Sequence, residues 1–237
     1  MSSTTQTPPS PSLTERRKAE TRMEIARAAA GLFVRHGLRA TRAEDIAQAA
    51  GIAPRTFYRY CATKEEAVAP LYAAGAQRWV EAVRAAPADA GVLPALEQGV
   101  CHTLTPGVGV SASSWEWVRT LLRLAEATPS LRRVWAEVCQ ASERLLGEVL
   151  AERVTRAGTP GTSGATGVSR GGDNVAAPGE APGITPGLRF AAAVASSAVR
   201  AALEAWAAGD GPVEGPDGPA ELALRNLAAL RDFPWGP

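Results

Sequence analysis

Apolar positions recur at helical spacing in the first part of the chain. Residues 12–36 carry them at Ile25, Ala28, Ala29, Leu32 and Phe33. This i, i+3, i+4, i+7, i+8 pattern is typical of a helix that buries one face. Ser12 and Glu15 form a capping box and Gly37 suits the C-cap, so we expect one helix from Ser12 to His36.

The next segment, residues 41–64, has the pattern of two short helices joined by a tight turn. Thr41 and Glu44 form a second capping box, which predicts that the first of these helices begins at Thr41. Gly51 follows where a C-cap with positive φ is needed. Pro54 suits the first helical turn, where its missing N–H would have no partner. The segment is therefore predicted to be a helix-turn-helix.

Apolar positions predict which side of this helix-turn-helix faces outward. Ile46, Ala47, Ile52 and Phe57 are the expected structural residues, with the small Ala47 where the two helices approach. With Phe57 inward, the second helix presents polar side chains, namely Arg55, Thr56, Tyr58 and Arg59. A surface helical hairpin with a few arginines is the alternative. The coincidence of turn glycine, aromatic anchor and basic outer face favours a helix that enters the major groove of DNA.

Helical periodicity continues to the end of the chain, and no strand-like alternation competes with it. Thr63 and Glu66 form another capping box, which predicts a helix from Thr63 to about Ala86 that Pro70 kinks or interrupts. Further helices are expected over residues 92–104, 113–127, 130–156, 186–207 and 219–232. Ser113 caps the second of these. The predicted fold class is all-α.

Composition marks two segments without helical periodicity. The polar, proline-containing residues 1–12 are expected to be a disordered arm. Residues 157–184 hold 11 Gly or Pro, which predicts a flexible loop. The predicted domains are therefore a helix-turn-helix domain over residues 13–62 and a larger helical domain over residues 63–237.

The helix after Pro186 is rich in small residues and apolar on more than one side. One face is expected to carry Ala191, Val194, Ala198, Ala201 and Ala205. A helix that is apolar nearly all round must be buried. It packs either in the core of its own chain or against a second subunit.

Charge is distributed unevenly, although the whole chain carries a net charge of only +1. Residues 1–64 contain 11 Lys and Arg against 5 Asp and Glu, and the remainder is net negative. This asymmetry indicates that only one end of the chain meets phosphate groups. Solvated arginine-rich helices alone would explain it less well.

Other features exclude several classes of protein. The three cysteines, Cys61, Cys101 and Cys139, are widely spaced, which favours free thiols in a reducing, cytoplasmic compartment. No signal peptide or membrane-spanning segment is expected. With two histidines and none of the CxxC, HExxH, GxGxxG or P-loop spacings, we expect no enzyme, no metal site and no cofactor.

The sequence RMEIARAAAGLFVRHGLRATRAEDIAQAAGIAPRTFYRYCATKEEAV carries an ordered set of landmarks. They are Phe33, Gly37, the Ile46-Ala47 pair, the Ala50-Gly51-Ile52 turn, the Thr56–Tyr60 segment and Lys64. In these positions the chain resembles the TetR family of bacterial transcriptional repressors, over about residues 13–70. Cys61 departs from the family pattern, which usually has a bulky aromatic there.

The resemblance implies a homodimer, formed by the last two helices, that binds a palindromic operator in double-stranded DNA and is released by a small-molecule effector. From the motif, Arg55 and Thr56 are the candidates for contacts to base edges, with Pro54 against a thymine methyl. The candidates for phosphate contacts are Thr41, Tyr58, Tyr60 and Lys64. Arg42 and Arg59 fit either class.

The resemblance also implies a pocket in the larger domain for an effector, which we expect to be apolar. Its candidate lining residues are Cys101, His102, Trp115, Trp117, Arg119, Arg123 and Trp135. Trp115 and Trp117 are two residues apart and cannot face the same side of a helix.

Two other functions remain open from the sequence. One is a redox-responsive DNA-binding protein that uses its free cysteines, since Cys61 lies beside the second helix of the helix-turn-helix. The other is an architectural DNA-binding protein that binds no ligand and uses its helical body as an interaction surface.

Overall fold

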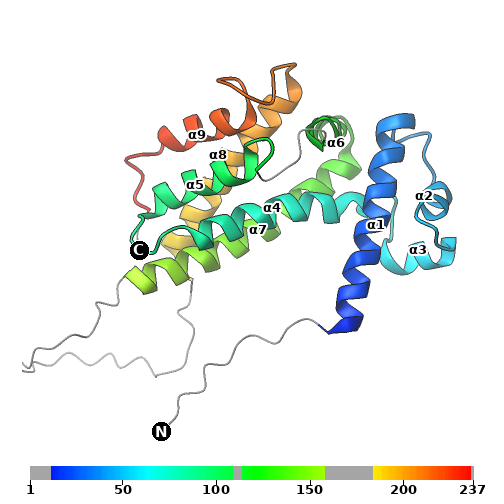
Figure 1. Ribbon diagram of the computed structural model, residues 1–237, viewed down its shortest axis with the longest axis horizontal. Helices are drawn as coiled ribbons and strands as arrows, with labels where there is room; N and C mark the ends of the chain where they lie inside the picture. Colours follow the sequence, from blue (N-terminus) through cyan, green and yellow to red (C-terminus); the bar gives the residue numbers. More distant parts are fainter. Residues whose placement is uncertain (1–11, 109–113, 158–183, 236–237) are drawn as a thin grey trace, which may run out of the picture. The chain divides into compact units, whose positions relative to one another are not determined.

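The structure, a computed structural model, describes residues 12–108, 114–157 and 184–235 (Figure 1). Within these ranges the fold is all-helical, as predicted, and contains no β-strand. The predicted arm (except Ser12), most of the predicted 157–184 loop and the predicted cap at Ser113 lie outside the described residues. The chain divides into two compact units, residues 1–72 and 73–237.

The first unit is built on the long helix α1 (Leu13–His36). The Ser12 hydroxyl accepts a hydrogen bond from the Glu15 amide at 3.2 Å, and Gly37 ends the helix with a φ of 77°. Ile25, Ala29 and Phe33 are buried as predicted. The buried arc is wider than the predicted stripe, because α1 contacts both α2 (Ala43–Ala49) and the short 3-10 helix η1 (Glu66–Val68).

Helix α2 begins at Ala43, so the predicted capping box of Thr41 and Glu44 is wrong. Thr41 is buried, and its hydroxyl donates to the Gly37 carbonyl at 2.9 Å instead of capping α2. The Arg42 amide donates to the Asp45 carboxylate at 2.8 Å, which satisfies one of the free donors at this helix start. Helix α3 (Pro54–Tyr60) follows after the turn at Gly51.

The helix predicted to start at Thr63 has a different construction. The Thr63 hydroxyl does accept from the Glu66 amide at 3.2 Å, but this turn leads into η1, and α4 (Ala69–Ala85) begins only afterwards. Pro70 is therefore the second residue of α4 and not an interior kink. A proline is tolerated there because the first-turn amides have no carbonyl partner within the helix.

The second unit contains most of α4 and the helices α5 (Val92–Leu104), α6 (Trp115–Ala127), α7 (Pro129–Ala157), α8 (Pro186–Ala208) and α9 (Pro219–Ala228). They surround one apolar core in which α8 packs against α6, α7 and α9 (Figure 1). Helix α9 ends before the predicted Asp232, because tight turns such as Phe233 amide to Leu230 carbonyl, 3.0 Å, replace the last helical turn.

Helix α8 is not buried all round, and the face predicted to carry its small residues is only partly covered. Ala191 is buried, but Ala201 and Ala205 are exposed. The bulky side chains of Leu188, Val199 and Trp206 enter the core instead, because they bury more apolar area than the alanines. The chain's own core thus covers one side of α8 and leaves Ala201 and Ala205 outward, whereas Val194 and Ala198 are partly buried against that core.

Candidate nucleic-acid interface

Helix α3 presents its polar side chains outward because Phe57 anchors it. Phe57 is fully buried, whereas Arg55, Tyr58 and Arg59 are exposed and Thr56 and Tyr60 are half-buried. The start of the helix is fixed by Ala53, whose carbonyl accepts from the Thr56 amide at 2.8 Å. Both candidates for base contacts, Arg55 and Thr56, therefore lie in the first turn of α3 beside the exposed Pro54.

The turn between α2 and α3 is set by Gly51. Its φ is +67°, a conformation that side-chain-bearing residues rarely adopt. The Ile52 amide then donates to the Ala47 carbonyl at 2.9 Å, which closes the end of α2. Ile46 and Ala47 are fully buried, so α2 supports α3 through an apolar face, as the sequence predicts.

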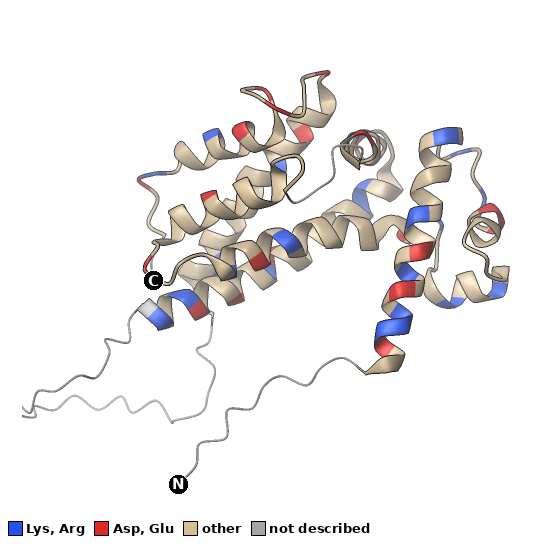
Figure 2. Cartoon of the chain, viewed as in Figure 1, with Lys and Arg blue, Asp and Glu red and all other residues tan. Residues whose placement is uncertain are grey.

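The tyrosines of α3 lie among charged groups. The Tyr58 hydroxyl donates to the Glu44 carboxylate at 3.4 Å. The Tyr60 ring has two guanidinium neighbours, Arg59 at 5.5 Å and Arg22 at 5.7 Å from its centroid. Basic side chains are spread along α1 and α3 (Figure 2). With the exposed Arg42, they give this unit the cationic surface that a phosphate backbone requires.

Two of the candidates for phosphate contacts have partners inside the protein. The Lys64 ammonium donates to the carbonyls of Leu38 at 2.7 Å and Thr41 at 2.8 Å. Thr41 is only 2% exposed, with its hydroxyl on the Gly37 carbonyl. Arg42, Tyr58 and Arg59, by contrast, are exposed.

Comparison with known proteins identifies the family. Residues 25–69 match the family model described as bacterial regulatory proteins, tetR family. The HTH-type transcriptional regulator TcmR of Streptomyces glaucescens is 31% identical over 156 residues, which is 64% of this chain and 68% of TcmR. The chain belongs to the TetR family. It is accordingly a DNA-binding transcriptional regulator with a helix-turn-helix, in a family of regulators and not of enzymes.

A solved structure shows the same fold. NalD, the secondary repressor of the MexAB-OprM multidrug efflux pump in Pseudomonas aeruginosa, has a TM-score of 0.50 and 19% sequence identity. The match covers 92% of this chain and 100% of the NalD chain. No helix among the described residues of this TetR-family chain is long and apolar enough to cross a membrane.

Cys61, the departure from the TetR-family pattern, is a buried free thiol at the end of α3. Burial, with a contribution from Glu66 opposed by Arg22, raises the pKa of Cys61 to about 11. Burial also raises the pKa of Cys139 to about 12 and that of Cys101 above its usual value. Since the thiolate is the reactive form, these pKa shifts disfavour a redox role for the three thiols.

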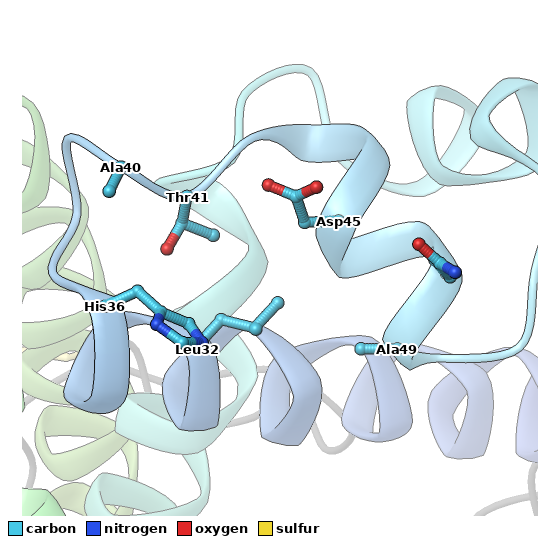
Figure 3. A pocket seen from close by; sticks show the side chains of 7 residues that line it. Leu32, His36, Ala40, Thr41, Asp45 and Ala49 are labelled. Atoms are coloured by element: carbon cyan, nitrogen blue, oxygen red, sulfur yellow. The ribbon is translucent and has the colours of Figure 1, made fainter.

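A shallow hollow of about 400 Å³ lies between α1 and α2 of the first unit (Figure 3). Its lining includes Leu32, His36, Ala40, Thr41, Asp45 and Ala49. Residues of α3 do not line it, so it is separate from the candidate base-reading side chains.

The structure brings together some of the candidate effector-binding residues. Trp115 is buried edge-on against Trp206 at 5.4 Å, and the Arg119 guanidinium lies 4.2 Å from the centre of the Trp206 ring. Arg123 donates to the Ala207 carbonyl at 2.6 Å, close to the end of α8. Trp135 donates to the Glu204 carboxylate at 2.8 Å.

The remaining candidates lie apart from this group. Cys101 and His102 are exposed on α5, and Trp117 is 39% exposed. The opposite surroundings of Trp115 and Trp117 confirm that the two rings face different sides of α6.

Sequence reasoning missed two polar groups in the core of the second unit. The indole N–H of Trp79 and the hydroxyl of Thr103 are buried, and like the Trp115 indole they have no hydrogen-bond partner among the described residues. Buried polar atoms without partners are rare in proteins. Helical periodicity could indicate that these positions are buried, but not that their polar atoms lack partners.

Proposed function

We propose that this TetR-family regulator is a repressor that binds a palindromic operator as a homodimer and is released by a small apolar ligand. The observation that carries the DNA-binding mode is the exposure of Arg55, next to the half-buried Thr56, in the first turn of an α3 that Phe57 anchors. A bidentate contact from Arg55 to guanine contributes about 1–3 kcal/mol of base discrimination. Since its target is bacterial DNA, its site of action is the cytoplasm.

Contacts to phosphate groups complete the interface in this proposal. Arg42, Tyr58, Arg59 and Tyr60 carry donors on the exposed side of the unit. Such contacts fix the register of the protein on DNA, whereas the base contacts of α3 supply the sequence preference.

A homodimer supplies the second recognition helix. One α3 spans only a few base pairs, so a palindrome needs two copies related by a two-fold axis. The outward side of α8 fits such a contact, because Phe190 is 61% exposed and Ala201 and Ala205, on the same side of the helix, are also exposed. Small residues allow two helices to approach closely.

The effector is supported by the unsatisfied polar atoms in the core of the second unit. The core is otherwise apolar around Trp79, Thr103 and Trp115. The two indole N–H groups and the threonine hydroxyl are donors without a partner among the described residues. A largely apolar molecule with a few hydrogen-bond acceptors would accept hydrogen bonds from these donors. Because such a molecule is neutral, its binding would not require a charge to be moved out of water.

The test is selection of genomic DNA fragments by the purified full-length protein, with Arg55→Ala as the matched variant. We expect the wild type to enrich one palindromic site and Arg55→Ala to lose that enrichment. Fragments without a common motif, recovered equally by both proteins, would contradict sequence-specific binding through α3. An architectural role would then account better for the data.

A further inference from the structure

Lys64 joins the two ends of the helix-turn-helix. Its ammonium donates to the carbonyls of Leu38 and Thr41, which lie 26 and 23 residues earlier in the chain, at 2.7 and 2.8 Å. Leu38 and Thr41 belong to the loop that leads from α1 into α2, and Lys64 follows α3. These two bonds therefore close the segment that contains both helices of the motif.

The loop that Lys64 contacts is also held by the buried Leu38 side chain and by two short-range hydrogen bonds. The Thr41 hydroxyl donates to the Gly37 carbonyl at 2.9 Å, and the Arg42 amide donates to Asp45 at 2.8 Å. A carbonyl that is not paired within a helix or strand must find another donor when it is shielded from water. Lys64 supplies that donor twice, with a charged group that forms stronger hydrogen bonds than a neutral one.

The chain also holds Lys64 itself in place. The Thr63 hydroxyl accepts from the Glu66 amide at 3.2 Å, and the Glu66 carboxylate accepts from the Ala62 amide at 2.9 Å. This pair of bonds fixes the turn around residue 64 before α4 begins. The position of the ammonium is therefore set by the fold and does not depend on a DNA phosphate.

We propose that Lys64 is a positioning residue, which supports DNA binding by fixing the loop of residues 37–42 and with it the placement of α2 and α3. The proposal rests on the DNA-binding mode proposed above. It differs from a phosphate contact in a measurable way. Loss of a phosphate contact makes the negative slope of log K against log salt shallower by about 0.9, whereas loss of a positioning contact lowers affinity and leaves the slope unchanged.

The test compares Lys64→Met with the wild type at several salt concentrations, on DNA that the wild type selects. Methionine keeps an unbranched side chain of similar length but removes the charge and the donors. We expect affinity to fall at least about tenfold with an unchanged salt slope, since the loss of even one hydrogen bond to a charged group has that effect and Lys64→Met removes two per subunit. Arg39→Met is the control, because it removes an exposed positive charge from the same loop.

Hydrogen exchange of the free protein gives a readout that needs no DNA. We expect the amides of residues 37–42 to exchange faster in Lys64→Met and at the wild-type rate in Arg39→Met. A salt slope that becomes shallower by about 0.9 per subunit in Lys64→Met, or loop exchange equal to that of the wild type, would overturn the proposal. If the wild-type protein selected no site, the proposed DNA-binding mode would be refuted instead. Hydrogen exchange of the free protein would then still test whether Lys64 fixes the loop.

A second variant covers the case in which Lys64→Met fails to fold. Thr41→Val keeps the shape of the buried side chain but removes the hydroxyl that donates to Gly37. We expect a loss of affinity without any change in charge, together with faster exchange of the same loop. Wild-type affinity with a loosened loop would show that the loop does not position α3, and would overturn the proposal.

Discussion

Addition of a single methyl group at Gly99 should destabilise the protein, although alanine is normally the better residue in a helix. A Cβ at this position of α5 would lie 2.7 Å from Val83 Cγ2 and 3.1 and 3.2 Å from the Cδ1 and Nε1 atoms of Trp79. Val83 is fully buried and Trp79 is 6% exposed, so neither side chain can move into solvent.

The expected magnitude follows from two opposing effects. Overpacking of a core costs about 1–3 kcal/mol, and replacement of glycine by alanine in a helix gains about 1 kcal/mol. We therefore expect Gly99→Ala to lower the free energy of unfolding by about 1 kcal/mol. The measurement is urea unfolding followed by circular dichroism, with midpoints and m-values compared between the variants.

Gly147 of α7 is the matched control because it is also buried in the middle of a helix. A Cβ there would lie 3.7 Å from Ala192 Cβ and Ile184 Cγ2, which is ordinary van der Waals contact. We expect Gly147→Ala to raise the free energy of unfolding by about 1 kcal/mol. Stabilisation by Gly99→Ala as well would refute the close packing of α4 on α5.

Three further predictions follow from other contacts. Arg153 is 5% exposed and donates to four carbonyls between Val83 and Ala90. Arg153→Met leaves these carbonyls without their donor, so it should lower the free energy of unfolding in urea by about 3 kcal/mol; equal stability of Arg153→Met and the exposed Arg156→Met would contradict this. Since the folded protein binds the thiol protons of Cys61 and Cys139 more tightly than the unfolded chain, the free energy of unfolding should fall as pH rises above about 9, and a double serine variant should lose part of that fall. A pH dependence identical in the two proteins would exclude this source. Ala201→Glu should shift the protein from dimer towards monomer in sedimentation, since a carboxylate would be buried in the proposed contact; an unchanged dimer would place the interface elsewhere.

The helices could be predicted because their signals are local in the sequence. Apolar spacing indicates the buried stripe of α1, and the observed bounds of α5, Val92–Leu104, are those expected from residues 92–104. Gly51 was predictable for the same reason, since positive φ at the end of a helix favours glycine whatever surrounds it.

The errors have tertiary causes. A capping box at Thr41 fits the sequence, but burial turns the hydroxyl towards Gly37 and leaves α2 to begin at Ala43. The spacing of the small residues in α8 predicts that they share a face, but it carries no information about which neighbours cover that face, so Ala191 is buried while Ala201 is exposed. Larger side chains such as Trp206 decide the packing instead.

The candidate interface also has features that could be predicted from the local sequence and features that could not. The outward face of α3 follows from the position of Phe57 in a seven-residue helix, so the exposure of Arg55 could be predicted. The partners of Lys64 and Arg153 could not, because their carbonyls lie between 23 and 70 residues away in sequence. Only the folded chain brings these groups together.

The most direct test of base reading by α3 is a cycle between Arg55→Ala and 7-deazaguanine, placed in the selected operator at each guanine in turn. This base lacks the N7 acceptor that an arginine fork uses. At one guanine of each half-site, we expect this replacement to weaken binding by the wild type and to leave binding by Arg55→Ala unchanged. The loss should be a part of the about 1–3 kcal/mol that the bidentate contact contributes. An equal loss in both proteins at every guanine would show that Arg55 does not read the base.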